Sequence, residues 1–460
     1  MITANENALE RATQNQINSE KDLFTFLSIP SVSTNPDEAA NVQQCAEWLA
    51  AHLSSCGLQH TEVITTAGHP IVFAEHRCAV PDAPTILFYG HYDVQPVDPL
   101  ELWTTPPFTP TVRDGKVFAR GATDDKGQVL IHAKALQALI ADGSLAVHIK
   151  MLIEGEEEVG SPNLAPFIKA NTQKLACDAV VISDTAMFAP NRPSLVVGLR
   201  GLAYVEIHVQ GPNRDLHSGA YGGPVVNPLN ALCSIIASMR NDDGSIAIDD
   251  FYTDVLELTP EEKGEIADLG SMDDRLIADV GVTALGGEKT YSTLEKLWVR
   301  PTLDLNGISG GYQAAGAKTV LPAKAMAKLS MRLVPNQKPE HIVELVRKHV
   351  QQHAPKGVTV SVVDLHGANP VYVNRDNAAT RAAKDALEKT FGVPCVFQRE
   401  GGSIPVVDLF TSVLQVPAVL MGFGLNTENL HSPNEHFHLE NFHKGIEACI
   451  RFYSSVQDFE

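Results

Sequence analysis

The sequence predicts an α/β fold made of two domains, one of them inserted in the other. At 460 residues the chain is longer than a single hydrophobic core usually serves. Up to residue 197 apolar strand patterns alternate with helical patterns, which is typical of a mostly parallel sheet covered by helices. Between about residues 198 and 369 the pattern changes to half-exposed strands, and after residue 370 the first pattern returns.

The larger domain is predicted to be discontinuous, comprising residues 1–197 and 370–460. Residues 85–89 and 178–183 are short apolar runs of the kind found in buried parallel strands, and residues 146–153 alternate in polarity. Apolar side chains at helical spacing predict helices over residues 41–53 and 128–141. The elements predicted after the insertion are helices over 378–391 and 441–454 and strands over 394–398 and 418–423.

The inserted domain, residues 198–369, is predicted to be of the α+β type. Residues 202–210 and 325–334 alternate between an apolar face and a more polar one, as in antiparallel strands with one exposed face. A third strand is predicted over residues 358–366, and helices over 226–240 and 340–353. Strands and helices in this mixture form a compact unit with its own core.

Charge and cysteine content exclude several classes of protein. The formal net charge is −20, whereas a nucleic-acid-binding protein needs a basic face to neutralise phosphates. Seven scattered cysteines, with no Cys-x-x-Cys pair, favour neither a disulfide framework nor a zinc ribbon. The polar N-terminus lacks the apolar core of an export signal, and no apolar run approaches the length of a membrane span. We therefore expect a cytoplasmic protein that binds neither nucleic acid nor membranes.

Two motifs, one directly after the strand over residues 85–89 and one ahead of the helix over residues 128–141, carry side chains that could bind metal ions. GHYDVQP (residues 90–96) directly follows the strand and places His91 two residues from Asp93, which could fix the histidine tautomer. RGATDDKG (residues 120–127) places Asp124 and Asp125 at the start of a helix. Taken alone, the first could be a His–Asp pair in an ordinary turn, and the second could cap exposed helix N–H groups.

Three further motifs add carboxylates and a second histidine. EGEEEVGS (residues 154–161) follows a buried strand, where crowded carboxylates repel one another unless solvent or a metal compensates them. ISDT (residues 182–185) ends another strand with Asp184, a position where a cap or turn residue is common. NLHSPNEHF (residues 429–437) contains His431, with His436 and His438 as competing candidates.

Together these motifs predict a metal site at the carboxyl ends of the strands, where open α/β sheets bind their ligands. Nitrogen and oxygen ligands without thiolates fit zinc or manganese in a hydrolytic site better than a structural zinc site. A carboxylate beyond the ligand set could serve as general base.

The ordered motifs resemble a metallopeptidase family that includes carnosinases, bacterial dipeptidases, aminoacylase, succinyl-diaminopimelate desuccinylase and glutamate carboxypeptidase. The resemblance runs from about residue 27 to the C-terminus. The forms DLHSGAYGG (residues 215–223) and REGGSIP (residues 399–405) favour the carnosinase-like dipeptidase branch. The other motifs that carry the resemblance are GHYDVQP, RGATDDKG, EGEEEVGS, ISDT, MRLVPN (residues 331–336) and LHSPNE (residues 430–435).

The resemblance implies two divalent ions per subunit, Zn²⁺ or Mn²⁺, bridged by Asp124. His91 and Asp184 would complete one metal site, and Glu158 and His431 the other. Asp93 would orient His91. The family also has a cis peptide bond after the bridging aspartate, so we expect one between Asp124 and Asp125.

Glu157 would be the general base, deprotonating the water that bridges the two ions and then protonating the leaving amine. This role follows from aligning residues 157–160 with the family's Glu-Glu-x-Gly. Glu156 lies outside that pattern and leaves the assignment ambiguous by one residue.

The inserted domain would be a lid and dimerisation domain. The resemblance implies that His217 reaches the active site of the partner subunit in a homodimer and stabilises the oxyanion. Arg332 would bind the free C-terminal carboxylate of the substrate, since a guanidinium can take a carboxylate in bidentate fashion. His366, Gly402 and Ser403 resemble further substrate contacts.

The implied function is that of a metal-dependent dipeptidase, which hydrolyses dipeptides or short peptides with a free C-terminal carboxylate. The alternative is an N-acyl amino acid amidohydrolase or a carboxypeptidase, because these enzymes share the metal core. A binding protein that keeps the fold without catalysis is a third possibility, and the complete ligand set with Glu157 argues against it.

Overall fold

The computed structural model describes residues 5–401 and 405–455, which form two compact units. The first unit comprises residues 1–197, 373–398 and 409–460, and the second comprises residues 198–372 and 399–408. The chain passes between them in β8 (Ser194–Leu199), directly after β15 (Val371–Tyr372), in β16 (Val396–Glu400) and in α13 (Pro405–Leu414). In the part of the chain that the structure describes, no helix combines the length and the apolar character that a membrane crossing requires.

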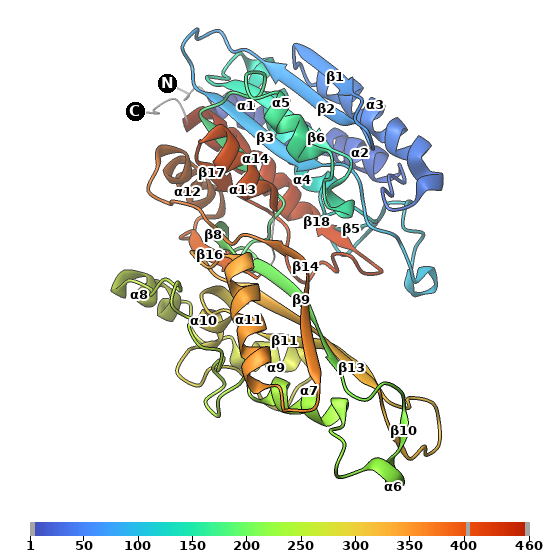
Figure 1. The fold of residues 1–460 in the computed structure, drawn as a ribbon. Coiled ribbons are helices and arrows are strands. Elements are labelled where there is room, and N and C mark those ends of the chain that lie inside the picture. Colours follow the sequence, from blue (N-terminus) through green and yellow to red (C-terminus); the bar gives the residue numbers. More distant parts are fainter. Residues whose placement is uncertain (1–4, 402–404, 456–460) are drawn as a thin grey trace. The chain divides into compact units, whose positions relative to one another are not determined.

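The first unit is built around a mixed sheet with the strand order β1-β2-β6-β3-β7-β17-β8 (Figure 1). Strand β3 pairs in parallel with β6 and β7, and β7 pairs in parallel with β17, whereas the other pairings along this order are antiparallel. The predicted α/β class is confirmed, with parallel pairing confined to the four central strands. The strands of this order are β1 (His60–Ile64), β2 (Ile71–His76), β3 (Thr85–His91), β6 (His148–Glu154), β7 (Ala179–Ile182), β17 (Ala418–Leu420) and β8.

The parallel strands bring the sequence motifs to one edge of this sheet. In the register, His91 at the end of β3 pairs with Glu154 at the end of β6. Tyr89 pairs with Ile182, the last residue of β7, which in turn pairs with Leu420 of β17. The loops that follow β3, β6 and β7 therefore start side by side.

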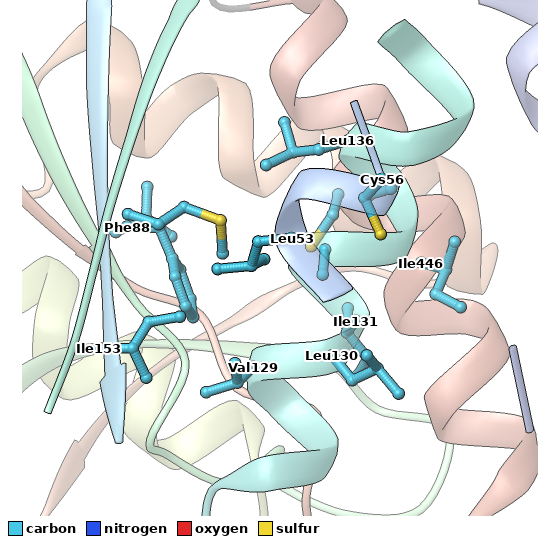
Figure 2. Packing of buried hydrophobic residues seen from close by; sticks show 14 of the residues in the cluster. Leu53, Cys56, Phe88, Val129, Leu130, Ile131, Leu136, Ile153 and Ile446 are labelled. Carbon is cyan, nitrogen blue, oxygen red and sulfur yellow. The ribbon is translucent and has the colours of Figure 1, made fainter. Parts of the chain in front are cut away.

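Helices of the first unit pack on this sheet around one large apolar core. In Figure 2, Phe88 of β3 and Ile153 of β6 face Val129 of α4, and Ile446 of α14 lies beyond that helix. The helix α4 is almost entirely buried and ends at Gly143, whose φ of 70° closes the helix in the left-handed conformation. The helices of this unit are α1 (Glu6–Gln14), α2 (Gln16–Leu27), α3 (Ala39–Ser55), α4 (Lys126–Asp142), α5 (Leu164–Ala170), α12 (Ala378–Phe391) and α14 (Leu439–Ser455).

Shorter elements complete the first unit. A small sheet of β4 (Thr111–Arg113), β5 (Lys116–Phe118) and β18 (His436–His438) precedes α14. The 3-10 helices are η1 (Pro36–Glu38), η2 (Leu100–Leu102) and η3 (Glu157–Val159), and η3 carries part of the EGEEEVGS motif.

A buried chain of hydrogen bonds crosses the first core. The Tyr453 hydroxyl lies 2.7 Å from His132 Nδ1, and His132 Nε2 lies 2.6 Å from Ser183 Oγ. Because Ser183 Oγ donates to the carbonyl of Met421 at 2.6 Å, His132 Nε2 must be the donor to Ser183 and Nδ1 the acceptor from Tyr453. This arrangement requires a neutral imidazole, and burial lowers the pKa of His132 to about 3.

We expect His132 to make stability pH-dependent in mild acid. An unfolded histidine takes up a proton below a pH of about 6.5, whereas folded His132 does so only near pH 3, so stability falls as the pH falls through this window. Between pH 6 and pH 5, wild type should lose about 1 kcal/mol more stability than His132→Gln, whose amide does not titrate. Urea unfolding at the two pH values measures this difference, and equal losses would contradict the assignment.

The second unit is an antiparallel sheet with the strand order β11-β13-β9-β14, with α7 and α11 packed against it (Figure 1). Along β9 and β13 buried residues alternate with partly buried ones, and the buried side chains meet the helices. The main elements are β9 (Gly201–Gln210), β11 (Asp304–Gly310), β13 (Lys324–Leu333), β14 (Thr359–Ala368), α7 (Pro228–Ala237) and α11 (Pro339–His353). The smaller elements are β10 (Leu216–His217), β12 (Val320–Leu321), β15 (Val371–Tyr372), α6 (Ser218–Tyr221), α8 (Pro260–Asp268), α9 (Asp273–Val280) and α10 (Thr293–Trp298).

An arginine fixes the segment between α7 and β11. The Arg300 guanidinium forms two hydrogen bonds through Nε and one through Nη2 to the carboxylate of Glu288, at 2.9–3.2 Å. The Cζ atom of Arg300 also lies 4.7 Å from the centroid of the Tyr252 ring and 4.2 Å from that of the Tyr291 ring. This mostly buried ion pair gives a loop-rich segment a stable anchor within the second unit.

Candidate metal centre

The structure gathers the five predicted metal-binding side chains into two overlapping groups in the first unit. One group is His91, Asp124 and Asp184, and the other is Asp124, Glu158 and His431. Within each group the ligand atoms lie within 4.8 Å of one another. His91 ends β3, Glu158 lies in η3 and Asp184 follows β7, so the edge of the sheet positions them.

Asp124 belongs to both groups because its two carboxylate oxygens face different histidines. Oδ1 lies 3.0 Å from His91 Nε2, and Oδ2 lies 2.8 Å from His431 Nε2. Asp184 Oδ2 is 3.9 Å from the same atom of His91, and Glu158 Oε2 is 3.5 Å from that of His431. As predicted, the bond between Asp124 and Asp125 is cis.

Asp93 supports both the first histidine and the 3-10 helix η3. His91 Nδ1 lies 3.1 Å from the backbone carbonyl of Asp93 and 3.4 Å from its Oδ1. The two carboxylate oxygens of Asp93 accept hydrogen bonds from the backbone N–H groups of Glu157 and Glu158, at 3.2 and 3.1 Å. One buried carboxylate thus orients His91 and fixes the turn that carries both glutamates.

The three consecutive glutamates of the EGEEEVGS motif, Glu156 to Glu158, have different surroundings. Glu156 accepts hydrogen bonds from the backbone N–H of His69 at 3.0 Å and from Asn163 Nδ2 at 2.8 and 3.1 Å. Glu158 belongs to the second metal-binding group. Glu157 lies close enough to the cluster for its pKa to respond to the charges of His91 and Asp184.

The pKa values of the glutamates and histidines in the cluster are shifted by burial and by the neighbouring carboxylates. Burial raises the pKa of Glu157 to about 7 and that of Glu158 to about 8, with neighbouring carboxylates adding to both shifts. The hydrogen bond that His431 donates to the Asp124 carboxylate is the main cause that raises the pKa of His431 to about 9. For His91, burial opposes protonation, but Asp124 and Asp93 hold its pKa well above the ordinary value.

These shifts show that the cluster favours positive charge at its two imidazoles. A divalent cation in each group would replace these protons and compensate the carboxylates. Two imidazoles and three carboxylates are ligands that zinc and manganese accept. The residues present therefore fit two divalent ions.

Gln95 is a contact of the cluster that the sequence reasoning missed. Its Nε2 donates to Glu158 Oε2 at 2.6 Å and so orients this carboxylate. Gln95 lies in the GHYDVQP motif, four residues after His91, and that placement was the available signal.

Comparison with known proteins agrees with this geometry. The model of peptidase family M20/M25/M40 matches residues 87–455, which is most of the chain and spans all five side chains of the cluster. The chain belongs to peptidase family M20/M25/M40.

Curated proteins and a solved structure resemble the chain over most of its length. The Cys-Gly metallodipeptidase dug1 of Schizosaccharomyces pombe is 35% identical, covering 95% of this chain and 96% of that protein. The human Beta-Ala-His dipeptidase is 32% identical over 84% of this chain and 77% of its own. The M20 family metallo-carboxypeptidase Sso-CP2 from Sulfolobus solfataricus is 34% identical with a TM-score of 0.82, covering 95% of this chain and 99% of that one.

Three further predicted site residues of this M20/M25/M40 family member, His217, Arg332 and His366, lie in the second unit. His217 is exposed on β10, and its Nδ1 accepts a hydrogen bond from Gly219 N at 3.0 Å. Arg332 and His366 lie on β13 and β14, which both pair with β9. Gly402 and Ser403 fall outside the described residues, so their predicted substrate contacts stay predictions.

Two neighbours of these second-unit residues were missed by the sequence reasoning. The His366 ring stacks on Tyr204 of β9, with 5.2 Å between ring centroids. Burial lowers the pKa of Arg200 to about 10, and the charge of Arg332 adds to this shift. The alternating pattern predicts that Tyr204 lies in a strand. Its contact with His366 could not be predicted, because no sequence pattern indicates which ring on another strand it stacks on.

Proposed function

We propose that the chain is a metal-dependent dipeptidase that hydrolyses dipeptides or short peptides with a free C-terminal carboxylate. The observation that carries the proposal is the division of the Asp124 carboxylate between two ligand groups, beside the further carboxylate of Glu157. The dipeptidase names of the fission-yeast and human relatives support the substrate class.

The residues that would hold two divalent ions, Zn²⁺ or Mn²⁺, are those of the two groups. His91 and Asp184 would complete one site and Glu158 and His431 the other, with Asp124 shared. When bound, the ions would supply Lewis-acid activation of water and of the scissile carbonyl. Asp93 keeps the Nε2 atom of His91 directed at its group through the contacts of Nδ1.

Glu157 is proposed as the general base and acid. Its carboxylate would take a proton from the attacking water and deliver it to the leaving amine. A base works best when its pKa lies near the operating pH, and burial of Glu157 acts in that direction. The hydrogen bond from its backbone N–H to Asp93 would hold the base in place.

The second unit is proposed to be a lid and dimerisation domain. Arg332 would bind the C-terminal carboxylate of the substrate, and His366, Gly402 and Ser403 would add contacts. His217 would stabilise the oxyanion in the active site of the other subunit of a homodimer. Closure of a lid over the substrate would exclude bulk water.

We also propose a cytoplasmic location. All seven cysteines are free thiols, three of them buried. Disulfides form and persist mainly in oxidising compartments, so free thiols fit the cytoplasm.

A carboxypeptidase is the second candidate, because the chain is 34% identical to a structure described as a metallo-carboxypeptidase. The two activities differ in the substrate groups that they require. A carboxypeptidase tolerates an extended or blocked N-terminal side, whereas a dipeptidase needs a short substrate.

The test measures hydrolysis of a dipeptide, its N-acetylated form and a tripeptide by metal-stripped protein with and without added Mn²⁺ or Zn²⁺. Metal-dependent cleavage that favours the free dipeptide is expected. Release of acetate from the N-acetylated form would instead indicate an amidohydrolase, and equal cleavage of the peptide bond in the N-acetylated form or the tripeptide would indicate a carboxypeptidase. Two bound ions without turnover on any substrate would contradict the enzymatic proposal.

A further inference from the structure

A buried ion pair lies beneath the loops that carry the candidate metal ligands. Arg120 Nη1 lies 2.6 Å from Glu435 Oε2, and each side chain is 1% exposed. Arg120 begins the RGATDDKG motif and Glu435 ends LHSPNE, yet neither residue has a role in the function proposed above. Burying two charges is costly, so their other contacts indicate what the pair does.

The Glu435 carboxylate holds the backbone of the loop from which Asp124 projects. Its Oε2 accepts the N–H of Gly121 at 3.0 Å in addition to the guanidinium. Its Oε1 accepts the N–H groups of Thr123 at 3.1 Å and of Asp124 itself at 3.2 Å. Three backbone donors on one carboxylate leave this loop little freedom.

Arg120 and Glu435 also connect this loop to the two others that carry ligands. Arg120 Nη2 donates to the carbonyl of Pro96 at 2.8 Å, at the end of the GHYDVQP motif that contains His91 and Asp93. Glu435 lies four residues after His431, on the same loop. The pair therefore ties together the loops of His91, Asp124 and His431.

We propose that Arg120 and Glu435 are a positioning pair that sets the Asp124 carboxylate midway between the two imidazoles. The inference rests on the proposed metal-dependent function. The two oxygens of Asp124 lie 3.0 and 2.8 Å from the histidine nitrogens, and this near-equal division requires a fixed backbone. Partners behind a ligand set its orientation, and their loss typically weakens metal affinity by about 10- to 100-fold.

The second unit offers a matched control. Arg300 and Glu288 also form a mostly buried ion pair, with side chains 10% and 11% exposed. Arg300 and Glu288 contact one another, Arg300 also contacts the rings of Tyr252 and Tyr291, and Glu288 accepts a hydrogen bond from the Tyr252 hydroxyl at 3.2 Å, all within the same unit. Breaking this pair tests the effect of losing a buried ion pair without disturbing a ligand loop.

The experiment compares Zn²⁺ affinity in wild type, Glu435→Gln, Arg120→Met and the control Glu288→Gln. Chelator competition gives the affinity, and the absorption spectrum of the Co²⁺-loaded protein reports ligand geometry. Both first-unit variants should bind Zn²⁺ about 10- to 100-fold more weakly with an altered Co²⁺ spectrum, and Glu288→Gln should match wild type. A merely structural pair would lower the melting temperature of the metal-free protein and leave affinity and spectrum unchanged.

Two conservative variants keep the proposal testable if the first ones fold poorly. Glu435→Asp retains the charge but is too short to reach all four donors, and Arg120→Lys loses the fork that reaches Glu435 and Pro96 together. Each should show the same weakening in a folded protein, and wild-type affinity in both would overturn the positioning role. Failure of wild type to bind Zn²⁺ would overturn the metal site itself, which separates the two proposals.

Discussion

Glu157→Gln is expected to lower kcat for dipeptide hydrolysis by about 10²- to 10⁴-fold while the metal ions stay bound. The amide keeps the size of the side chain and the backbone N–H bond to Asp93, but it cannot accept the proton from water. Because Glu157 lies outside the two ligand groups, metal affinity should change little. Steady-state kinetics together with the metal content of the purified variant measure the two effects separately.

Glu156→Gln is the control for this prediction, since it differs by one position in the same motif. Glu156 is engaged by His69 and Asn163, away from the ligand groups, so kcat should stay within a few-fold of wild type. A collapse of activity in Glu156→Gln with an active Glu157→Gln would show that the base is assigned one residue too far along the chain.

Much of the architecture behind this site is predictable because parallel strands end at one edge. Once residues 85–89, 146–153 and 178–183 are read as strands, the motifs after them must start close together. The spacing of His91 and Asp93 likewise predicts a local contact, and the structure has one. Strand ends and residue types thus made His91, Glu158 and Asp184 accessible as ligand candidates, whereas the choice of Asp124 and His431 rested on the family resemblance.

The direction of strand pairing was harder to predict from the sequence, because a buried strand is apolar whether it pairs in parallel or antiparallel with its neighbour. Strand β2 lies antiparallel to the central strand β6, and β8 lies antiparallel to the central strand β17, although the sequences of β2 and β8 are apolar like those of the central strands. The support of Asp124 by Glu435 joins positions more than 300 residues apart, and no local pattern encodes it. The hydrogen bond between Glu156 and the backbone of His69 could not be predicted either, because the two residues are 87 positions apart in the sequence.

Asp124→Ala is expected to abolish tight binding at both metal sites, whereas Asp184→Ala and His431→Ala should each weaken one. The reason is geometric: Asp124 is the member that the two groups share, and the other four residues belong to one group each. Equilibrium binding of Zn²⁺ to the metal-stripped variants, with metal content after gel filtration, gives the number of ions that each retains.

The single-group variants make this test of Asp124 discriminating. If Asp124→Ala kept one tightly bound ion, only one carboxylate oxygen of Asp124 would be a metal ligand in wild type. The other oxygen would then only accept a hydrogen bond from a histidine, and the shared-ligand proposal would be wrong. If Asp184→Ala and His431→Ala also lost both ions, the two groups would bind metal only together. Retention of one ion in each of these variants, with none in Asp124→Ala, is the pattern that a carboxylate shared by two sites requires.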